Sequence, residues 1–153
     1  DARISGLLLG KVARARELGV ELRIDDESRL TALNGALKDI DVVGIVGNLL
    51  ENAIEAAASV RGGTKPLVRC LIRGGGHRLA IDVVDNGPGI PDALLSRILA
   101  GELSTKGAGR GMGLALVRRE VDLVGGQLAV DREPGSPRFS IMLDEEVRVG
   151  RPD

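Results

Sequence analysis

The stretch "NLLENAIEAA", residues 48–57, places polar and apolar side chains on opposite faces of a predicted helix. Asn48, Glu51, Asn52 and Glu55 recur at spacings of three and four residues, so they share one face. The opposite face carries Val46, Leu49, Leu50, Ala53 and Ala57. Asn is a poor helix former because its side chain competes for local backbone hydrogen bonds. Two asparagines one turn apart are therefore predicted to be ligands rather than ordinary surface residues.

A long glycine-rich segment lies downstream, between a predicted strand and a predicted helix. It begins with "DNGPGI", residues 85–90, where Asp85 ends an apolar run and two glycines allow the backbone to approach a ligand closely. It ends with "GRGMGLAL", residues 109–116, which leads into a helix whose unpaired N-terminal N–H groups favour an anion such as phosphate. Each pattern alone is common in turns. Their order after the asparagine-bearing helix is a combination that chance rarely assembles, so the order favours a functional role for the three patterns.

The remaining periodicities predict an α+β fold, a two-layer α/β sandwich with a mixed sheet of about five strands and helices packed on one face. Residues 26–38 are expected to form a polar loop. The segment "GGGH" is expected to be the flexible tip of a hairpin. The predicted helices span residues 2–18, 39–59 and 112–124, and the predicted strands span residues 20–25, 67–73, 78–85, 127–131 and 138–143.

Composition excludes several classes of function. The chain has 153 residues, 21 basic and 22 acidic, so no overall field attracts nucleic acid or an acidic membrane surface. It has no Trp or Tyr and one Phe, which removes the aromatic platforms on which single-stranded nucleic acid stacks. Cys70 is the single cysteine, so a disulfide within the chain is impossible and a small buried hydrophobe is expected. No apolar run is long enough to span a bilayer.

The three motifs together resemble the ATP-binding catalytic domain of sensor histidine kinases. This domain belongs to the superfamily that also contains DNA gyrase, the mismatch-repair protein MutL and heat-shock chaperones. "NLLENAIEAA" resembles the N box, "DNGPG" the first glycine box and "GRGMGLALV" the second. The likeness covers about residues 19–143 and is nearest to the citrate and C4-dicarboxylate sensor kinases. It implies the Bergerat ATP-binding fold, with ATP and Mg²⁺ as cofactors.

The resemblance also implies roles for individual residues. Asn52 would coordinate Mg²⁺, Asn48 would help to hold the metal and phosphates, and Asp85 would accept a hydrogen bond from the adenine amino group. Lys106 and Arg110 would be lid cations that neutralise transferred charge during catalysis. The remaining expected nucleotide contacts are Gly87, Gly89, Ile90, Thr105, Gly109, Gly111, Met112, Gly113 and Leu114.

Departures from the family patterns limit the expected activity. Gyrase-type hydrolases have a catalytic glutamate where this chain has Asn48, so hydrolysis is expected to be poor. The segment "RILAGELSTKG" lacks the phenylalanines of the usual F box, so lid anchoring would depend on Leu94, Leu95, Ile98 and Leu99. The alternatives are a gyrase- or MutL-type ATPase and a degenerate nucleotide-binding scaffold. Measuring ATP binding and hydrolysis separately distinguishes them.

The expected reaction is transfer of the γ-phosphate to a histidine on a separate dimerisation domain of the same kinase, with a cognate response regulator as an indirect partner. Residues 1–18 are expected to be a helical connection from that upstream domain, residues 19–144 the catalytic domain and residues 145–153 a flexible tail. The fragment is expected to be cytoplasmic, without nucleic-acid or membrane contact, in a membrane-anchored homodimeric parent. For five other polar residues, an ordinary surface role is the main alternative to a functional one. They are His77, Glu51, Glu55, Arg14 and Arg16.

Overall fold

A computed structural model describes residues 1–60, 62–88, 96, 109–131 and 137–144. Its described part contains three α-helices, α1 (Ala2–Glu17), α2 (Val42–Ala58) and α4 (Gly109–Leu123), and a short 3-10 helix, η1 (Gly35–Asp39). The strands are β1 (Glu21–Ile24), β2 (Arg29–Leu33), β3 (Leu67–Gly76), β4 (Arg78–Asp85), β5 (Gln127–Asp131) and β6 (Arg138–Asp144).

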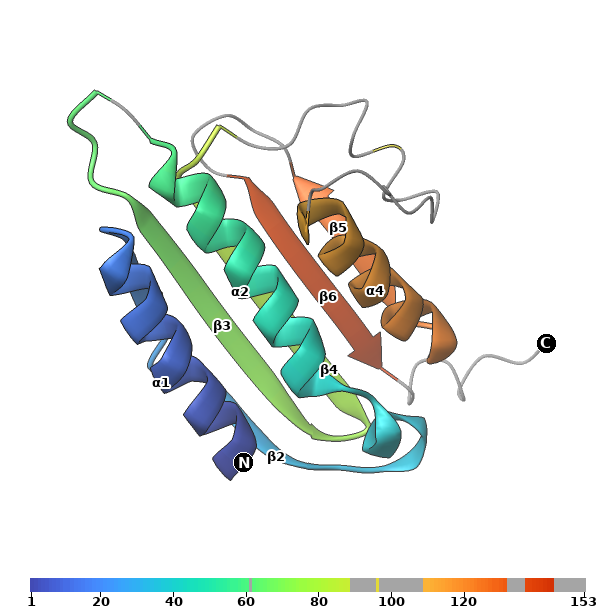
Figure 1. The fold of residues 1–153 in the computed structure, drawn as a ribbon. Helices are drawn as coiled ribbons and strands as arrows, with labels where there is room; N and C mark the ends of the chain where they lie inside the picture. Colours follow the sequence, from blue (N-terminus) through green and yellow to red (C-terminus); the bar gives the residue numbers. More distant parts are fainter. Residues whose placement is uncertain (61, 89–95, 97–108, 132–136, 145–153) are drawn as a thin grey trace.

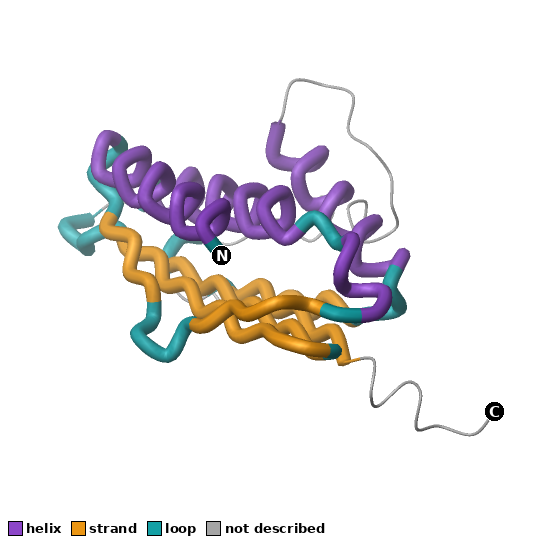
Figure 2. Tube along the Cα trace, turned by 90° about the horizontal axis from the view of Figure 1, so that it is seen from below, coloured by secondary structure: helices purple, strands orange, loops and turns teal. Residues whose placement is uncertain are grey.

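The strands form one mixed sheet in the order β1-β3-β4-β6-β5, and β2 also pairs with β3. β4 occupies one edge of β3 along most of its length, so β1 and β2 lie one after the other along the opposite edge, both parallel to β3. The three α-helices cover one face of the sheet (Figures 1 and 2). The predicted two-layer fold class is confirmed, with six strands instead of about five.

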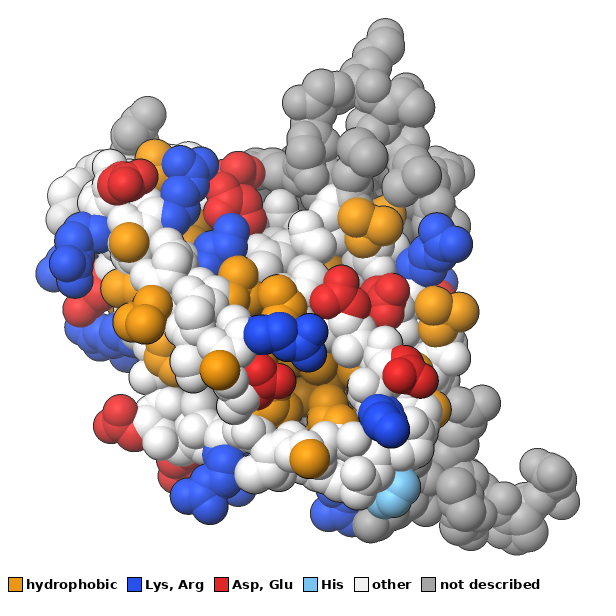
Figure 3. All heavy atoms as spheres, turned by 60° about the horizontal axis from the view of Figure 1, so that its bottom comes forward, with side chains coloured by type: hydrophobic (Ala, Val, Ile, Leu, Met, Phe, Trp, Pro, Cys, Tyr) orange, Lys and Arg blue, Asp and Glu red, His pale blue; other side chains and the backbone are white. Residues whose placement is uncertain are grey.

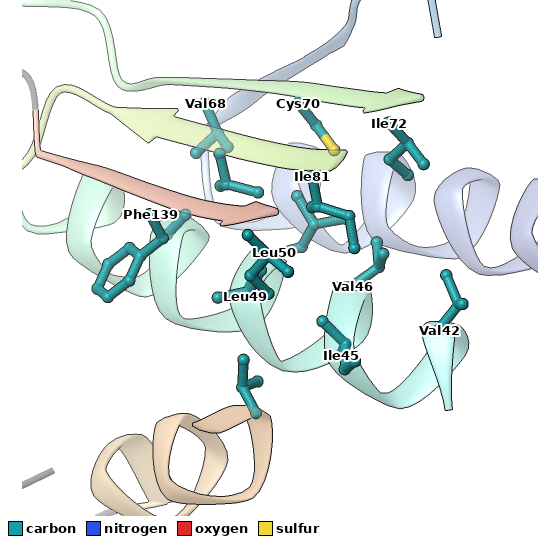
Figure 4. Packing of buried hydrophobic residues seen from close by; sticks show 14 of the residues in the cluster. Val42, Ile45, Val46, Leu49, Leu50, Val68, Cys70, Ile72, Ile81 and Phe139 are labelled. Atoms are coloured by element: carbon teal, nitrogen blue, oxygen red, sulfur yellow. The ribbon is translucent and has the colours of Figure 1, made fainter. Parts of the chain in front are cut away.

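The core lies between α2 and the inner face of the sheet (Figure 4). Alternate residues of the central strands point inward because successive side chains of a strand face opposite ways, as Val68, Cys70 and Ile72 of β3 do. The apolar stripe of α2 packs onto them, with Leu49 and Leu50 fully buried. The polar stripe of α2 therefore faces away from the sheet.

The helix ends follow their capping residues. The Asp1 side chain accepts a hydrogen bond from the Arg3 N–H, at 2.8 Å, and caps α1. Gly19, at φ +74°, stands just after this helix. α1 also contributes Ile4 and Ala15 to the core, so it packs as part of the sandwich, and its predicted role as a connection from an upstream domain stays a prediction.

Two predictions about loops are wrong. The predicted polar loop over residues 26–38 contains β2 and η1. The apolar residues of "RLTAL" do not alternate strictly, so the pattern did not predict a strand. The segment is a strand because it pairs with β3, where Leu30 lies opposite Gly74 and Leu33 opposite Gly76. The glycines of "GGGH" belong to β3 rather than to a flexible tip. A Cβ at Gly74 would lie 2.8 Å from the Cδ1 atoms of both Leu30 and Leu79, so glycine allows β2 and β4 to pack closely there.

Charged side chains of both signs are interspersed over the surface that Figure 3 views, with hydrophobic side chains between them. No helix within the described ranges has the length and apolar character needed to cross a membrane.

Candidate functional site

Helix α2 positions Asn48 and Asn52 on the face that looks toward α4. The helix begins after Asp41, whose side chain accepts a hydrogen bond from the Gly44 N–H at 2.9 Å. One turn later the Asn48 Nδ2 donates to the Gly44 carbonyl oxygen at 2.8 Å, which holds the amide and directs its Oδ1 away from its own helix backbone. The first asparagine of the motif is thus oriented by the backbone of α2.

The first turns of α4 lie against this asparagine pair. A Cβ placed on Gly113 would stand 2.9 Å from Asn48 Oδ1 and 3.5 Å from Asn52 Nδ2. These distances leave little room for a side chain at Gly113. The structure therefore brings together the N-box asparagines and the second glycine motif, which lie about sixty residues apart in the sequence.

The Asn52 amide is the notable polar group at this contact. Its Nδ2 is buried and has no hydrogen-bond partner within the part of the chain that the structure describes. Burying an amide without a hydrogen bond costs free energy, so such a group needs an explanation. A half-turn of the amide about its Cβ–Cγ bond exchanges its donor and acceptor ends. The group can therefore offer either an N–H or an oxygen to a ligand.

Asp85 stands at the end of β4, on the inner side of the sheet, and is only 4% exposed. The Gly87 N–H donates to Asp85 Oδ1 at 2.7 Å, which holds the carboxylate in one orientation. A Cβ on Gly87 would lie 2.6 Å from the Ala56 carbonyl oxygen of α2. Glycine is thus required sterically where the turn after β4 passes the C-terminal part of α2.

Asn86 holds this turn in place, a role that the sequence analysis missed. Its Oδ1 accepts from the Leu67 N–H at 3.0 Å, and its Nδ2 donates to the Lys65 carbonyl oxygen at 2.8 Å. These two bonds connect the end of β4 to the beginning of β3. Asn is typical of turns, but its partners about twenty residues upstream are not readable from the local pattern.

Glu51, between the two asparagines, does not face α4. It accepts from Lys11 Nζ at 2.8 Å and from Arg14 Nη2 at 3.1 Å, both on α1. The hydrogen bond from Lys11, together with the two positive charges, lowers the pKa of the Glu51 carboxyl below its ordinary value. Arg14 therefore connects α1 to α2, and it stays on the solvent-exposed face of α1, as predicted.

Two other candidates lie away from this site. His77 forms the turn between β3 and β4, at the opposite end of β4 from Asp85. Cys70 is buried in the core, where burial raises the pKa of its thiol to about 12, with the charge of Asp82 adding to the effect. A small buried hydrophobe was the predicted role of this cysteine, and its burial is confirmed.

The structure does not reach every predicted site residue. Gly89, Ile90, Thr105 and Lys106 lie outside the described residues, as do the expected lid anchors Leu94, Leu95, Ile98 and Leu99. Gly109, Arg110, Gly111 and Met112 form the first turn of α4, but their side chains are outside the description. Leu114 is 1% exposed and packs in the core, so only its backbone is available to a ligand.

Residues 38–147 match the family of histidine kinase-, DNA gyrase B- and HSP90-like ATPases, and the chain belongs to this family. The predicted resemblance is therefore confirmed. Members of this family bind ATP, so a nucleotide is the ligand class of this domain, whereas Mg²⁺ and the individual site residues remain predictions.

The similar proteins are sensor histidine kinases. The chain is 40% identical over 132 residues to the sensor histidine kinase CitA of Klebsiella pneumoniae, covering 86% of this chain and 24% of that protein. It is 38% identical to the sensor histidine kinase DcuS of Escherichia coli K12, with the same coverage. The catalytic domain of the histidine kinase ThkA has the same fold, with a TM-score of 0.65 at 20% identity, over 94% of this chain and 90% of that domain. The chain spans about a quarter of the length of these two curated relatives.

Proposed function

We propose that this chain binds Mg-ATP between α2, the turn after β4 and the N-terminal turns of α4, and donates the γ-phosphate to a histidine on a separate dimerisation domain. Membership of the ATPase family supports ATP as the bound nucleotide. The similarity to sensor histidine kinases at 38–40% identity supports histidine as the acceptor.

The buried Nδ2 of Asn52, which has no partner among the described residues, is the observation that carries this proposal. It lies near Gly113 of α4 together with Asn48 Oδ1, since a Cβ on that glycine would be 3.5 Å from Asn52 Nδ2 and 2.9 Å from Asn48 Oδ1. Mg²⁺ prefers oxygen ligands, keeps several of its waters and uses substrate phosphates for the rest of its coordination. An amide oxygen from Asn52, assisted by Asn48, fits that requirement. Bound Mg²⁺ would supply neutralisation of the phosphate charge.

Asp85 is the proposed adenine-selecting residue. Its carboxylate is buried and held by Gly87, so an oxygen in a fixed position can accept a hydrogen bond from an exocyclic amino group. A carboxylate at this point favours adenine over guanine, because guanine presents a carbonyl oxygen at the equivalent ring position. Lys106 and Arg110 are the proposed cations on the transferred phosphate.

The N–H groups of the first turns of α4 are the proposed phosphate contacts. The first four N–H groups of a helix have no partner within the helix, and the helix dipole makes this end positive. Gly113 lies within these turns, next to both asparagines. The same group of residues would therefore hold the metal and the phosphates together.

The proposed partners are the histidine-bearing dimerisation domain of the same kinase and, through it, a cognate response regulator. The parent is proposed to be a membrane-anchored homodimer with this domain in the cytoplasm. Asn48 supports transfer over hydrolysis, because an amide cannot take a proton from water as a carboxylate can.

The test measures three properties of the isolated chain. We expect calorimetry to detect ATP binding, and we expect both ADP release and self-labelling from radiolabelled γ-phosphate to be slow. Phosphoryl transfer depends on a positioned in-line acceptor. Adding a separately produced dimerisation domain of the same kinase is expected to restore transfer, and Lys106→Ala or Arg110→Ala is expected to reduce transfer more than binding.

Other outcomes would contradict the proposal. Rapid ADP release by the chain alone would favour a gyrase- or MutL-type ATPase. No ATP binding by a folded chain would favour a degenerate scaffold. Labelling of His77 at the rate of the reconstituted pair would remove the need for an external acceptor.

A further inference from the structure

The outer face of the sheet, which looks away from α1, α2 and α4, has no element packed on it in the described ranges (Figure 2). The strand register puts four residues of this face in one row across β2, β3, β4 and β6. Arg29 pairs with Arg73, Arg73 with Ala80, and Ala80 with Met142. Arg78 follows in the next row, opposite Gly75 of β3.

A groove of about 790 Å³ runs along this row. The small side chain of Ala80 lies between the longer side chains of Arg73, Arg78 and Met142, and the Thr31 hydroxyl occupies the space beside Gly75. The turn between β1 and β2 forms the other wall of the groove. We call this the arginine groove; its lining is Asp26, Glu27, Ser28, Arg29, Arg73, Gly74, Gly75, Arg78, Leu79, Ala80 and Met142.

On the strand side of the arginine groove, two arginines have no ion pair within the described chain, whereas the turn side carries the carboxylates Asp26 and Glu27. Arg29 and Arg73 are direct cross-strand neighbours, and like charges in such a pair are unfavourable. Neither of them makes an ion pair with any described residue. Asp26 and Glu27 line the turn side of the groove, yet neither pairs with these arginines.

The carboxylates of the neighbouring strands are already engaged. Asp144 is 3.2 Å from Arg78 Nε. Asp82 accepts from the Ser140 hydroxyl at 2.7 Å and lies 3.5 Å from Arg138 Nε. Among the described strand residues at this groove, the charges without an ion pair are therefore the positive charges of Arg29 and Arg73.

We propose that the arginine groove docks an acidic segment of a partner protein. Carboxylates of the segment would pair with Arg29 and Arg73 and relieve their mutual repulsion. An apolar side chain of the segment would cover Met142, which is 55% exposed, and the adjacent Ala80. Arg and Met are both enriched in protein interfaces relative to the rest of the surface, which supports a protein partner over a small anion.

This surface is distinct from the nucleotide site. Asp85 is at the other end of β4 from Arg78, and it lies on the inner face of the sheet whereas the arginine groove lies on the outer face. Docking and ATP binding can therefore be measured independently on the same chain.

The test uses a fluorescein-labelled peptide of six glutamates and two leucines, titrated with the whole chain at low ionic strength and followed by fluorescence anisotropy. We expect saturable binding. Arg73→Glu and Arg29→Glu are each expected to raise Kd about tenfold, because each replaces an attraction with a repulsion. Met142→Ser is expected to weaken binding about threefold.

Arg69→Glu is the matched control. Arg69 is an exposed arginine of β3 on the same face, outside the groove, and it makes no ion pair with a described residue. Its substitution changes the net charge equally, so a change in Kd of less than about twofold is expected. Unchanged thermal unfolding midpoints and ATP affinities would show that the groove variants are folded.

Equal losses from Arg69→Glu and Arg73→Glu would overturn the proposal, because binding would then reflect a diffuse positive field. Absence of saturable binding to the unmodified chain would overturn it as well. Displacement of the peptide by stoichiometric inorganic phosphate, with no effect of Met142→Ser, would identify an oxyanion site instead.

Discussion

Asp85 combines burial with a fixed orientation, since its Oδ1 accepts from the Gly87 N–H and its side chain is almost inaccessible. Asp85→Asn keeps an Oδ1 acceptor for that turn, so the fold should survive. The amide would replace the charged acceptor that we propose for adenine, and hydrogen bonds to charged groups contribute about 1.5–3 kcal/mol. We therefore expect ATP affinity to fall roughly ten- to hundredfold, measured by calorimetry. Unchanged affinity in a folded variant would remove Asp85 from the site.

Asn52 is predicted to act on the metal rather than on the base. Asn52→Ala removes an oxygen ligand and no adenine contact, so Mg-ATP should be weakened far more than magnesium-free ATP. The measurement is a pair of titrations, with Mg²⁺ and with a chelator. Asn86→Ala is the matched control. It removes an asparagine that holds the turn after β4 to the chain around Lys65 and Leu67, so any loss of ATP affinity should be the same with and without Mg²⁺. Equal losses with and without Mg²⁺ would mean that Asn52 is structural.

At the scale of elements, Glu51 connects α2, the helix of the asparagine pair, to α1 through Lys11 and Arg14. Its pKa in the folded chain is lowered from the ordinary value of 4.5, chiefly by the hydrogen bond from Lys11. The unfolded chain consequently binds a proton more readily, and stability rises with pH. The stability that ionised Glu51 contributes is fully present above about pH 4.5, and it is lost as the pH falls through the lower pKa of Glu51 in the folded chain.

Glu51→Gln removes the charge, so the free energy of unfolding at pH 7 should fall by about 1 kcal/mol. The difference from the unmodified chain should shrink as the pH falls below 4.5. Urea unfolding at pH 7 and at pH 3 measures both effects. Glu17→Gln, at an exposed glutamate of α1 with no ion pair among the described residues, should have little effect at either pH. A Glu51 variant with a pH-independent deficit would contradict this account.

At the scale of the whole molecule, the sandwich encloses the single thiol. Cys70 is 1% exposed and its pKa is raised to about 12, so almost no thiolate is present near neutral pH. We expect a thiol-reactive disulfide reagent at pH 8 to label the native chain only slowly, and to label it stoichiometrically after unfolding in guanidinium. Rapid stoichiometric labelling of the native chain would contradict the burial of Cys70.

Local sequence determined the three α-helices and five of the strands, whereas β2 and η1 could not be predicted from it. The three-and-four spacing of apolar residues in 39–59 and the alternation in 78–85 express the geometry of single elements, so they could be read without any partner. The nearness of the asparagine pair to the second glycine motif was inferred from family resemblance, and the structure supplies its contact at Gly113. The expected lid residues remain a prediction, because they lie outside the described residues.

Tertiary structure alone decided the contacts between segments that are distant in the chain. Glu51 forms an ion pair with residues about forty positions upstream. Asn86 donates a hydrogen bond to the chain before β3, and Arg29 lies opposite Arg73 on the neighbouring strand. No local pattern encodes these partners, because they depend on strand register and on how α1 packs against α2. Register is set by burial of a whole face of the sheet, and a shift of one residue would turn every side chain to the other face.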